Sequence, residues 1–234
     1  MLTVDKVYAG YYEDIHILKD LSMQVQEQTI TAIIGTNGVG KSTLLKTIYG
    51  FLTPREGSIV YNDEDISGIS PYKAPKKGLT YIPQQRNVFP EMTVEENIRL
   101  GGWTFKRKTK KITKRLEENF ERFSVINDRR KEKAGNLSGG MQRMVELGRA
   151  LMIAPELMLV DEPAAGLAPM IARQIYDHLL SLRDDGMTVL LVDQNIRHAV
   201  KIADYLYVLA KGTNEEEGPR EDFENIKEKI KGWL

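Results

Sequence analysis

A glycine-rich segment between an apolar run and a helix-forming run constrains this chain more than any other feature. Residues 35–43 read GTNGVGKST. Residues 30–34 before it are apolar and β-branched, as in a buried strand, and residues 44–49 after it favour a helix that ends at Gly50. The segment therefore predicts a strand, a tight loop and a helix in succession.

This strand–loop–helix pattern is typical of a phosphate-binding loop. The glycines let backbone N–H groups point at phosphate oxygens, and the following helix directs the positive end of its dipole toward them. Lys41 is predicted to reach the β- and γ-phosphates, and the Ser42 hydroxyl to ligate Mg²⁺. The alternative is a glycine-rich turn that binds nothing, but such a turn would not require the complete strand–loop–helix pattern found here. We therefore expect nucleoside triphosphate binding by the whole loop: Gly35, Thr36, Asn37, Gly38, Val39, Gly40, Lys41, Ser42 and Thr43.

Composition narrows the class of protein. The 234 residues suit one large α/β domain, and 33 basic side chains balance 33 acidic ones, so no global field draws the chain to nucleic acid or membrane. The lack of cysteine excludes disulfides and thiolate metal sites and fits a reducing compartment. No signal-peptide pattern is present and the apolar runs are strand-length, so we expect membrane association only through a partner.

Short apolar segments recur along the chain and fall into two groups. The first group, separated by turns, indicates antiparallel strands. It comprises residues 2–7, 21–25 and 58–61. The second group, separated by helical stretches, indicates parallel strands that are buried on both faces. It comprises residues 79–82, 157–160 and 189–192.

No strand pattern occurs between Val94 and Ala154. Helices are expected from about residue 94, over about 113–123 and after Ser138, which predicts an all-helical insertion. The expected fold class is therefore α/β: a P-loop NTPase (RecA-like) core with a parallel sheet, an antiparallel β subdomain and an inserted all-helical subdomain.

We expect one domain over residues 1–234. Its catalytic core, with the antiparallel part, should comprise about 1–86 and 155–212, and its helical subdomain about 87–154. A C-terminal helix is expected over about 219–234, because the apolar residues there share one helical face. They are Phe223, Ile226, Ile230 and Trp233.

Residues 106–115 are strongly basic. They could contact anionic lipid or nucleic acid, but acidic residues follow directly at 117, 118 and 121, and no aromatic residue is interleaved. We favour a solvated helix face and expect no nucleic-acid partner.

A second apolar run ends in two adjacent carboxylates, Asp161 and Glu162. Asp161 is expected to hold the Mg²⁺ shell, and Glu162 to polarise the attacking water as general base. Two solvent-facing acids at a strand end are the alternative, which the upstream phosphate loop disfavours.

Residues 137–143 read LSGGMQR. Ser138 suits a helix N-cap, and Gly139 and Gly140 leave the first turn without side chains. Such a helix start offers N–H groups and the helix dipole to an anion, which makes it a second candidate phosphate-binding surface. Taken alone, Ser-Gly-Gly is equally compatible with a turn.

Together and in this order, the three motifs resemble those of the nucleotide-binding subunit of ATP-binding cassette (ABC) proteins, over the chain to about Gly218. The resemblance implies ATP and Mg²⁺ as ligands. It also implies a head-to-tail dimer in which Ser138 and Gly140, with Gly139 between them, contact the γ-phosphate bound to the other copy. In the same way it implies that Gln84 touches Mg²⁺ and the attacking water, and that Tyr11 stacks on adenine.

Three features depart from the family's pattern. Gln194 stands where a histidine usually senses the γ-phosphate; glutamine forms hydrogen bonds but cannot become cationic, which leaves Glu162 as the expected base. Ala168 stands where an aspartate is common, so one polar contact between the two sites is missing. Residues 212–218 are shorter and more acidic than the strand with a glycine-rich turn that the family usually has there.

The sequences GLAP at 166–169 and VDQN at 192–195 resemble those of subunits that power importers of branched-chain amino acids and the related urea and amide importers. Residues 88–97 and 100–102 resemble the second of the two cassette subunits of such importers. The implied partners are transmembrane permease subunits, a sister cassette in a heterodimer (or a second copy in a homodimer) and, indirectly, a solute-binding protein. The implied location is the cytoplasmic side of the cell membrane.

Two other classes stay open. A non-transport cassette ATPase, such as an iron–sulfur assembly factor, shares the same motifs; a translation-associated factor would normally need two cassettes in one chain. A regulatory nucleotide switch without catalysis is the third class, against which the intact pair Asp161–Glu162 argues.

Overall fold

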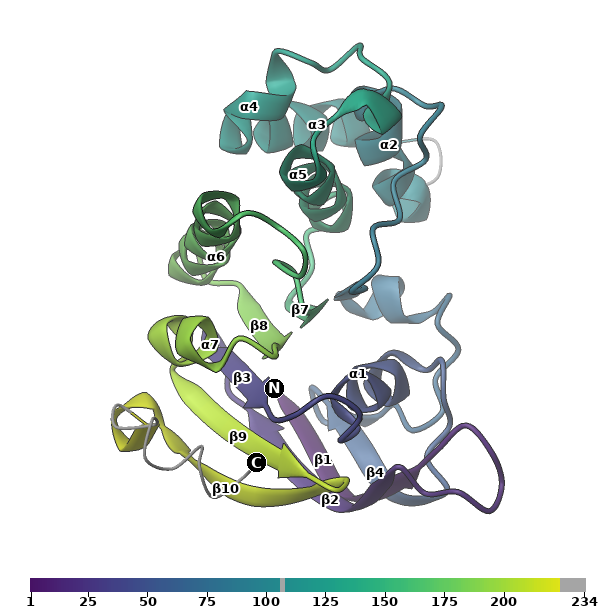
Figure 1. The fold of residues 1–234 in the computed structure, drawn as a ribbon. Coiled ribbons are helices and arrows are strands. Elements are labelled where there is room, and N and C mark those ends of the chain that lie inside the picture. The colour runs from purple at the N-terminus through teal and green to yellow at the C-terminus, as the bar shows by residue number, and fades with distance from the viewer. Residues whose placement is uncertain (106–107, 224–234) are drawn as a thin grey trace.

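Two β-sheets and a set of helices build the molecule, whose computed structural model describes residues 1–105 and 108–223 (Figure 1). One sheet is antiparallel and has the strand order β2-β1-β4-β5. Its strands are β1 (Leu2–Ala9), β2 (Leu18–Val25), β4 (Glu56–Tyr61) and β5 (Glu64–Asp65). The other sheet has the order β10-β9-β3-β8-β7-β6.

The antiparallel sheet buries one face. In β1, Leu2 and Val4 point into the core, and a register shift between Val4 and Val7 accompanies the positive φ of 47° at Lys6. This irregularity lets Val7 and Ala9 return to the buried face after the bulge. The predicted antiparallel strands are thus present, each longer by a few residues.

The second sheet is parallel except at one edge. Its parallel strands are β3 (Ile30–Ile34), β6 (Leu79–Ile82), β7 (Leu157–Asp161), β8 (Thr188–Val192) and β9 (Tyr205–Ala210). Every residue of β3, β7 and β8 is buried, because helices or the other sheet cover both faces. The parallel strands predicted from continuous apolar runs are confirmed.

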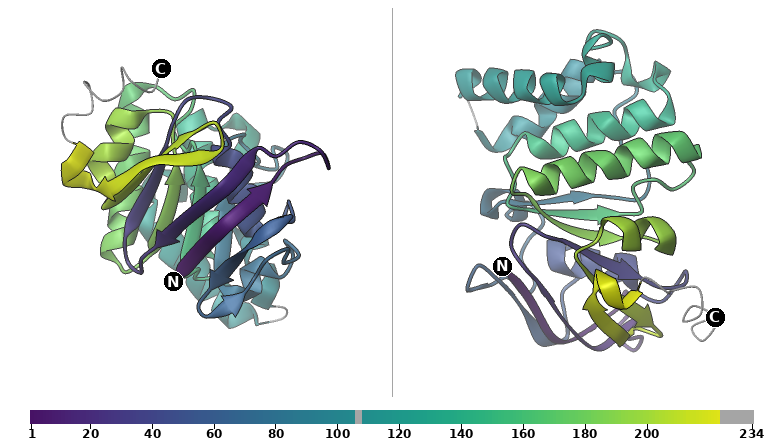
Figure 2. Two further views of the ribbon diagram at one scale, coloured as in Figure 1. Left: turned by 90° about the horizontal axis from the view of Figure 1, so that it is seen from below. Right: turned by 90° about the vertical axis from the view of Figure 1, so that its left-hand side faces the viewer.

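Helix α1 (Lys41–Tyr49) lies between the two sheets, where Leu44, Leu45 and Ile48 join the core that the sheets share. On the other face of the parallel sheet lie α6 (Pro169–Asp184) and α7 (Ile196–Ile202). Figure 2 shows this layering from two further sides.

The stretch between β6 and β7 is helical, as expected. It contains α2 (Val94–Leu100), η2 (Gly101–Phe105), α3 (Thr109–Arg122), α4 (Ser124–Asn127), η3 (Ala134–Asn136) and α5 (Gly139–Leu151), and it lies at the end of the molecule opposite the antiparallel sheet (Figure 1). A capping box between Thr93 and Glu96 starts α2. The boundaries of the helical subdomain at 87 and 154 stay a prediction.

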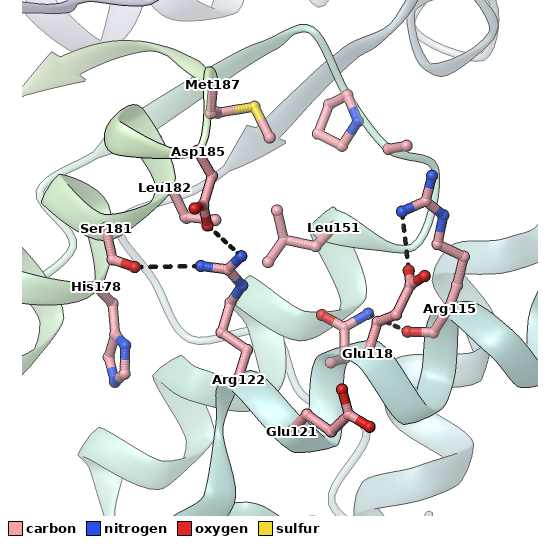
Figure 3. A pocket seen from close by; sticks show the side chains of 13 residues that line it. Arg115, Glu118, Glu121, Arg122, Leu151, His178, Ser181, Leu182, Asp185 and Met187 are labelled. Atoms are coloured by element: carbon pink, nitrogen blue, oxygen red, sulfur yellow. Dashed lines mark hydrogen bonds and ion pairs between the residues drawn. The ribbon is translucent and has the colours of Figure 1, made fainter.

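A polar contact ties the helical part to the core beside a cavity of about 700 Å³ between α3 and α6. There Arg122 of α3 donates a hydrogen bond to Ser181 Oγ at 3.3 Å and forms an ion pair with Asp185 (Figure 3). None of the predicted site residues lines this cavity.

Two expectations need revision. Helix α3 begins at Thr109, four residues before the predicted start, so it carries part of the basic stretch; Arg115 and Lys114 pair with Glu118. The interpretation of residues 212–218 as a departure from a strand was wrong: Thr213–Pro219 is strand β10, antiparallel to β9.

Strand β10 forms because Lys211 and Gly212 adopt positive φ values of 50° and 87°, as in a tight hairpin turn. Backbone pairing with β9 outweighs the acidic composition. After it, η4 (Arg220–Phe223) buries Phe223. Of the C-terminal helix predicted over about 219–234, Pro219 ends β10 and residues 220–223 form η4, so the helix does not begin at 219; the rest of that prediction lies outside the described residues. Among the described residues, no helix combines the length and hydrophobicity that a bilayer crossing needs.

Candidate functional site

The glycine-rich loop wraps around the side chain of Lys41. Gly40, with a φ of 109°, turns the chain into α1 in a conformation that side chains rarely adopt. The Lys41 ammonium donates hydrogen bonds to the backbone oxygens of Gly35 at 2.8 Å and Thr36 at 2.9 Å. The loop therefore holds a cation at its centre, next to the N-terminus of a helix.

Lys41 is only 4% exposed. Burial lowers the pKa of its ammonium, and the carboxylates of Glu162, Asp161 and Asp193 oppose that shift. This site holds one buried positive charge beside three carboxylates. Binding an anionic ligand together with a cation would therefore compensate the charges of both kinds.

Asp161, at the end of β7, contacts the loop directly. Ser42 Oγ donates a hydrogen bond to Asp161 Oδ1 at 2.9 Å, and Tyr81 Oη donates one to Oδ2 at 3.2 Å. The adjacent parallel strands β6 and β7 bring Tyr81 and Asp161 to the same edge of the sheet. The structure thus unites Ser42 and Asp161, two of the three residues predicted to contact the metal; the third is Gln84.

Glu162 leaves the strand with a φ of 43°, in the left-handed region that non-glycine residues rarely occupy. Its backbone N–H bonds to the Val192 carbonyl oxygen at 2.8 Å. Such a conformation costs about 1–3 kcal/mol and is often found at functional sites. It turns the side chain back toward Gln84, whose Nε2 donates a hydrogen bond to Glu162 Oε2 at 2.8 Å.

Burial raises the pKa of both acids. For Asp161, hydrogen bonds from Ser42 and Tyr81 oppose the effect of burial; for Glu162, the Lys41 charge opposes it while Asp161 and Asp193 add to it. A carboxylate whose pKa moves upward is better suited to accept a proton from water near neutral pH.

An open cavity of about 790 Å³ lies beside the loop. Four of the predicted site residues line it: Tyr11, Ser42, Gln84 and Asp161. Tyr11 is 48% exposed and its hydroxyl accepts a hydrogen bond from Lys46 Nζ at 3.0 Å. A half-exposed ring at the cavity wall is available to a flat apolar ligand, as the assignment to adenine requires.

The residues around Ser42 fit a magnesium ion. Mg²⁺ usually takes one or two carboxylates together with substrate phosphates and water, and the site offers the Ser42 hydroxyl, the Asp161 carboxylate and the Gln84 amide. Among the described residues no cluster of three or more His, Cys, Asp or Glu side chains could hold a metal alone. A metal at this position therefore depends on the phosphates for part of its coordination.

The second predicted phosphate surface is the first turn of α5, in the helical part. Ser138 caps the helix by accepting a hydrogen bond from the Met141 N–H at 3.4 Å, and it is exposed. Gly140 is buried instead, because Ile171 of α6 packs so closely that a Cβ at residue 140 would lie 2.2 Å from Ile171 Cγ2. In the described residues, no hydrogen bond joins Ser138 to the Lys41 loop of the same chain.

The two single residues that depart from the family's pattern, Gln194 and Ala168, lie beside β8 and α6. Gln194 follows β8 and is exposed. Ala168 is the N-cap residue of α6, also exposed, and offers no side-chain cap.

Asp193 was not identified from the sequence as a third buried carboxylate whose charge acts on Lys41. It is 3% exposed, accepts hydrogen bonds from Tyr176 Oη at 2.6 Å and from the Asn195 N–H at 2.7 Å, and burial raises its pKa. A signal was present: the apolar run 188–192 ends in a carboxylate, as the run before Asp161 does.

Comparison with known proteins identifies the family. The family model described as ABC transporter matches residues 18–165. The high-affinity branched-chain amino acid transport ATP-binding protein BraG of Pseudomonas aeruginosa is 42% identical over 91% of this chain and 90% of its own length. The probable branched-chain amino acid transport ATP-binding protein LivF of Archaeoglobus fulgidus is 39% identical, over 91% of this chain and 89% of its own length.

Solved structures agree with this family. An ATP-binding cassette of an ABC transporter superposes with a TM-score of 0.89 at 31% identity, over 99% of this chain and 96% of that one. Further matches include a lipopolysaccharide export ATP-binding protein of Haemophilus influenzae, 31% identical over 91% of this chain, and a dimeric cassette bound to ADP and phosphate, 26% identical with a TM-score of 0.82. The chain therefore belongs to the ABC transporter family and is an ATP-binding subunit, an ATPase that couples hydrolysis to transport.

Proposed function

We propose that this chain is the ATP-hydrolysing subunit of an importer for branched-chain or related amino acids. One observation supports the catalytic part above all: the Ser42–Asp161 bond of 2.9 Å and the Gln84–Glu162 bond of 2.8 Å join three separate segments, the loop, the end of β7 and the residues after β6, at one cavity edge. The substrate class is supported by relatives named as branched-chain amino acid transport proteins.

Each residue has one role in this proposal. Lys41 and the backbone N–H groups of residues 35–43 hold the triphosphate, and Tyr11 stacks on adenine. Ser42 and Asp161 hold Mg²⁺, which supplies charge neutralisation on the phosphates when it is bound. Gln84 orients the attacking water, and Glu162 accepts its proton. Gln194 contacts the γ-phosphate side as a neutral hydrogen-bonding group.

The dimer belongs to the same proposal. Ser138, Gly139 and Gly140 of one chain are assigned to the triphosphate bound by the other, because the exposed cap of α5 does not meet the Lys41 loop of its own chain. The solved dimeric cassette with ADP and phosphate supports a two-cassette arrangement. A sister cassette is the preferred second copy, since importers of this type use two cassette subunits.

A second cavity provides a docking place for the permease. We call it the aromatic groove; it measures about 360 Å³ and its apolar wall includes Tyr49, Tyr81, Phe89, Leu100 and Trp103. Phe89 is 50% and Trp103 49% exposed. Large apolar side chains gathered at an exposed groove favour a protein partner, and Asn87 lines both this groove and the nucleotide cavity. Docking of transmembrane permease chains here would place the cassette at the cytoplasmic face of the membrane.

The proposed division into a core (1–86 and 155–212) and a helical subdomain (87–154) gives this groove a function. The groove takes residues from β6 of the core and from α2, η2 and α5 of the helical part. A partner seated there would respond to any rotation of one part against the other.

Affinity purification from solubilised membranes tests the proposal. We expect the tagged chain to retain transmembrane permease chains, and the reconstituted complex to take up labelled leucine, isoleucine or valine only with ATP. The variant Phe89→Glu/Trp103→Glu, altered in the aromatic groove, should no longer copurify with the permease chains but should bind ATP normally. Retention of an iron–sulfur scaffold protein without any membrane chain would contradict a role in transport. ATP-driven export of a lipid-linked glycan would contradict import; export is the direction that the name of one relative indicates.

A further inference from the structure

A buried ion pair lies in α5, where Arg143 and Glu146 follow the start of the helix by about one and two turns. Arg143 Nη1 lies 2.8 Å from Glu146 Oε2, and the two side chains are 2% and 1% exposed. Charged side chains are rarely buried this deeply unless other groups complete their hydrogen bonding.

The groups that complete it belong to the loop around Gln84. Arg143 Nη1 donates to the backbone oxygen of Pro83 at 2.8 Å, and Nη2 donates to that of Gln84 at 2.7 Å. The other Glu146 oxygen, Oε1, accepts a hydrogen bond from the Asn87 N–H. The pair therefore holds backbone atoms on both sides of the exposed residues 84–86.

The guanidinium is oriented toward this loop rather than toward α5 alone. Its Nε is buried and has no hydrogen-bond partner among the described residues, so the two terminal nitrogens make all of its described contacts. A fork that satisfies two successive carbonyl oxygens fixes the loop in direction as well as in distance.

The held loop leads directly to the chemistry. Gln84 donates to Glu162 at 2.8 Å, so a shift of its backbone would move the amide that faces the proposed base. At its other end, α5 begins with the exposed Ser138, assigned above to the triphosphate of the other cassette. Glu146 and Asn87 also line the aromatic groove. One rigid helix thus joins the proposed partner contact, the loop and the groove wall.

We propose that Arg143 and Glu146 are positioning residues, here called the clasp, that transmit engagement of the neighbouring cassette at Ser138 to the placement of Gln84 against Glu162. This inference rests on the proposed function. Without the clasp, the loop would be held to α5 mainly by Arg149, which bonds to the Asn87 oxygens. Gln84 would then face Glu162 for a smaller fraction of time, which slows hydrolysis without weakening nucleotide binding.

The test removes both charges at once, because a single substitution would leave the other charge buried and unpaired. The variant is Arg143→Met/Glu146→Leu, in the full chain assembled with the permease and sister chains that copurify with it. We expect kcat for ATP hydrolysis to fall at least about tenfold, a loss of about 1.4 kcal/mol of transition-state stabilisation, while the ATP affinity changes less than about twofold. Trypsin cleavage after the exposed Arg86 should become several times faster.

The chain offers a control pair of the same residue types at the surface. Arg115 and Glu118 of α3 have the same residue types and spacing, and their side chains lie 2.9 Å apart, but neither contacts the loop. Arg115→Met/Glu118→Leu should leave kcat and cleavage after Arg86 unchanged. Should the clasp variant fail to fold, Arg143→Gln/Glu146→Gln replaces it with neutral polar side chains; the shorter glutamine at 143 cannot form the two-nitrogen fork, and the same results are expected.

A double-mutant cycle separates positioning from general damage. In the Gln84→Ala background, removing the clasp should cost less than about twofold in kcat, because its effect passes through that side chain. An equal loss in both backgrounds, or an unchanged kcat in the clasp variant, overturns the inference. If the unmodified complex itself neither binds nor hydrolyses ATP, the proposed function fails instead, and that result is visible before any clasp variant is measured.

Discussion

The proposed chemistry rests on a few side chains held at the ends of buried strands. Lys41 is enclosed by the carbonyl oxygens of its own loop, and Asp161 and Glu162 lie where β7 ends. Their spacing in the sequence predicted the roles of a phosphate loop and a metal-binding and catalytic acid pair. The bonds from Ser42 to Asp161 and from Gln84 to Glu162 required the fold, since 119 and 78 residues separate the partners.

Lys41→Ala should reduce ATP affinity at least about tenfold, corresponding to about 1.4 kcal/mol. The reason is the loss of the only cation that the loop encloses among the described residues. Isothermal titration calorimetry measures this, with Lys110→Ala on the exposed surface of α3 as control. Equal affinities for the two variants would refute the phosphate assignment.

Glu162→Gln should bind ATP with nearly unchanged affinity but hydrolyse it at least about 100-fold more slowly, because an amide cannot accept the proton from water. The Gln84 hydrogen bond can persist, since the glutamine oxygen still accepts. Phosphate release under saturating ATP measures the effect. Turnover at the normal rate would remove Glu162 from its proposed role.

The same substitution has a pH-dependent effect on stability. Burial raises the pKa of Glu162 in the folded protein above its usual value of 4.5. The folded state therefore favours the protonated acid, and this contribution is present at low pH and is lost as pH rises through the raised pKa. Glu162→Gln should thus be more stable than the unmodified ligand-free chain at pH 8, with a smaller difference at pH 4.5.

Urea unfolding at the two pH values measures that difference. Asp161 and Asp193, whose pKa values are also raised, are unchanged in both proteins and serve as a common background. A variant that is less stable at pH 8 than the unmodified chain would contradict the expected cost of burying the carboxylate.

At the scale of elements, contacts between helices determine what the site can do. The helices predicted in the insertion are present, but the close approach of α5 to α6 was not predictable from either helix. Gly140 was expected to leave a bare surface for an anion, yet Ile171 lies against it. Gly140 therefore allows close packing of α5 against α6, in addition to its proposed contact with the ligand.

Gly140→Ala should destabilise the ligand-free chain by about 1–3 kcal/mol, because its methyl group would lie 2.2 Å from Ile171 Cγ2 and must displace it. Chemical denaturation measures the loss. Combining it with Ile171→Ala should recover stability beyond the additive expectation, since the smaller side chain makes room. Strict additivity of the two substitutions would show that this contact is not the cause.

At the scale of the whole molecule, the two phosphate surfaces point to a shared active site. The loop belongs to the core and the Ser138 cap to the helical part, and in the function proposed above a second cassette supplies the cap that completes the site. The resemblance implied this arrangement, and within one chain no hydrogen bond among the described residues joins Ser138 to the Lys41 loop.

In the Glu162→Gln background, ATP should therefore convert the chain, alone or mixed with its sister cassette, to a species with the mass of two cassettes. Light scattering after gel filtration measures the mass. Ser138→Arg should abolish the shift while each chain still binds ATP, because the arginine would obstruct the proposed interface. Unchanged association by that variant would place the interface elsewhere.

The sequence by itself determined the local elements and the motifs, because strand burial, loop glycines and paired acids depend on residues that are close along the chain. It predicted the α/β class, the loop from 35 to 43 and most strands of both sheets, but not β5 or β9. It failed for β10, where a hairpin turn and an available sheet edge outweighed acidic composition.

Only the tertiary structure decided which distant groups meet. The hydrogen bond between Tyr176 and Asp193, the aromatic groove and the clasp join segments that no local pattern relates. Packing selects such pairs because a buried charge or hydroxyl must find a partner wherever the fold places one. Local propensity carries no information about that partner until the core has formed.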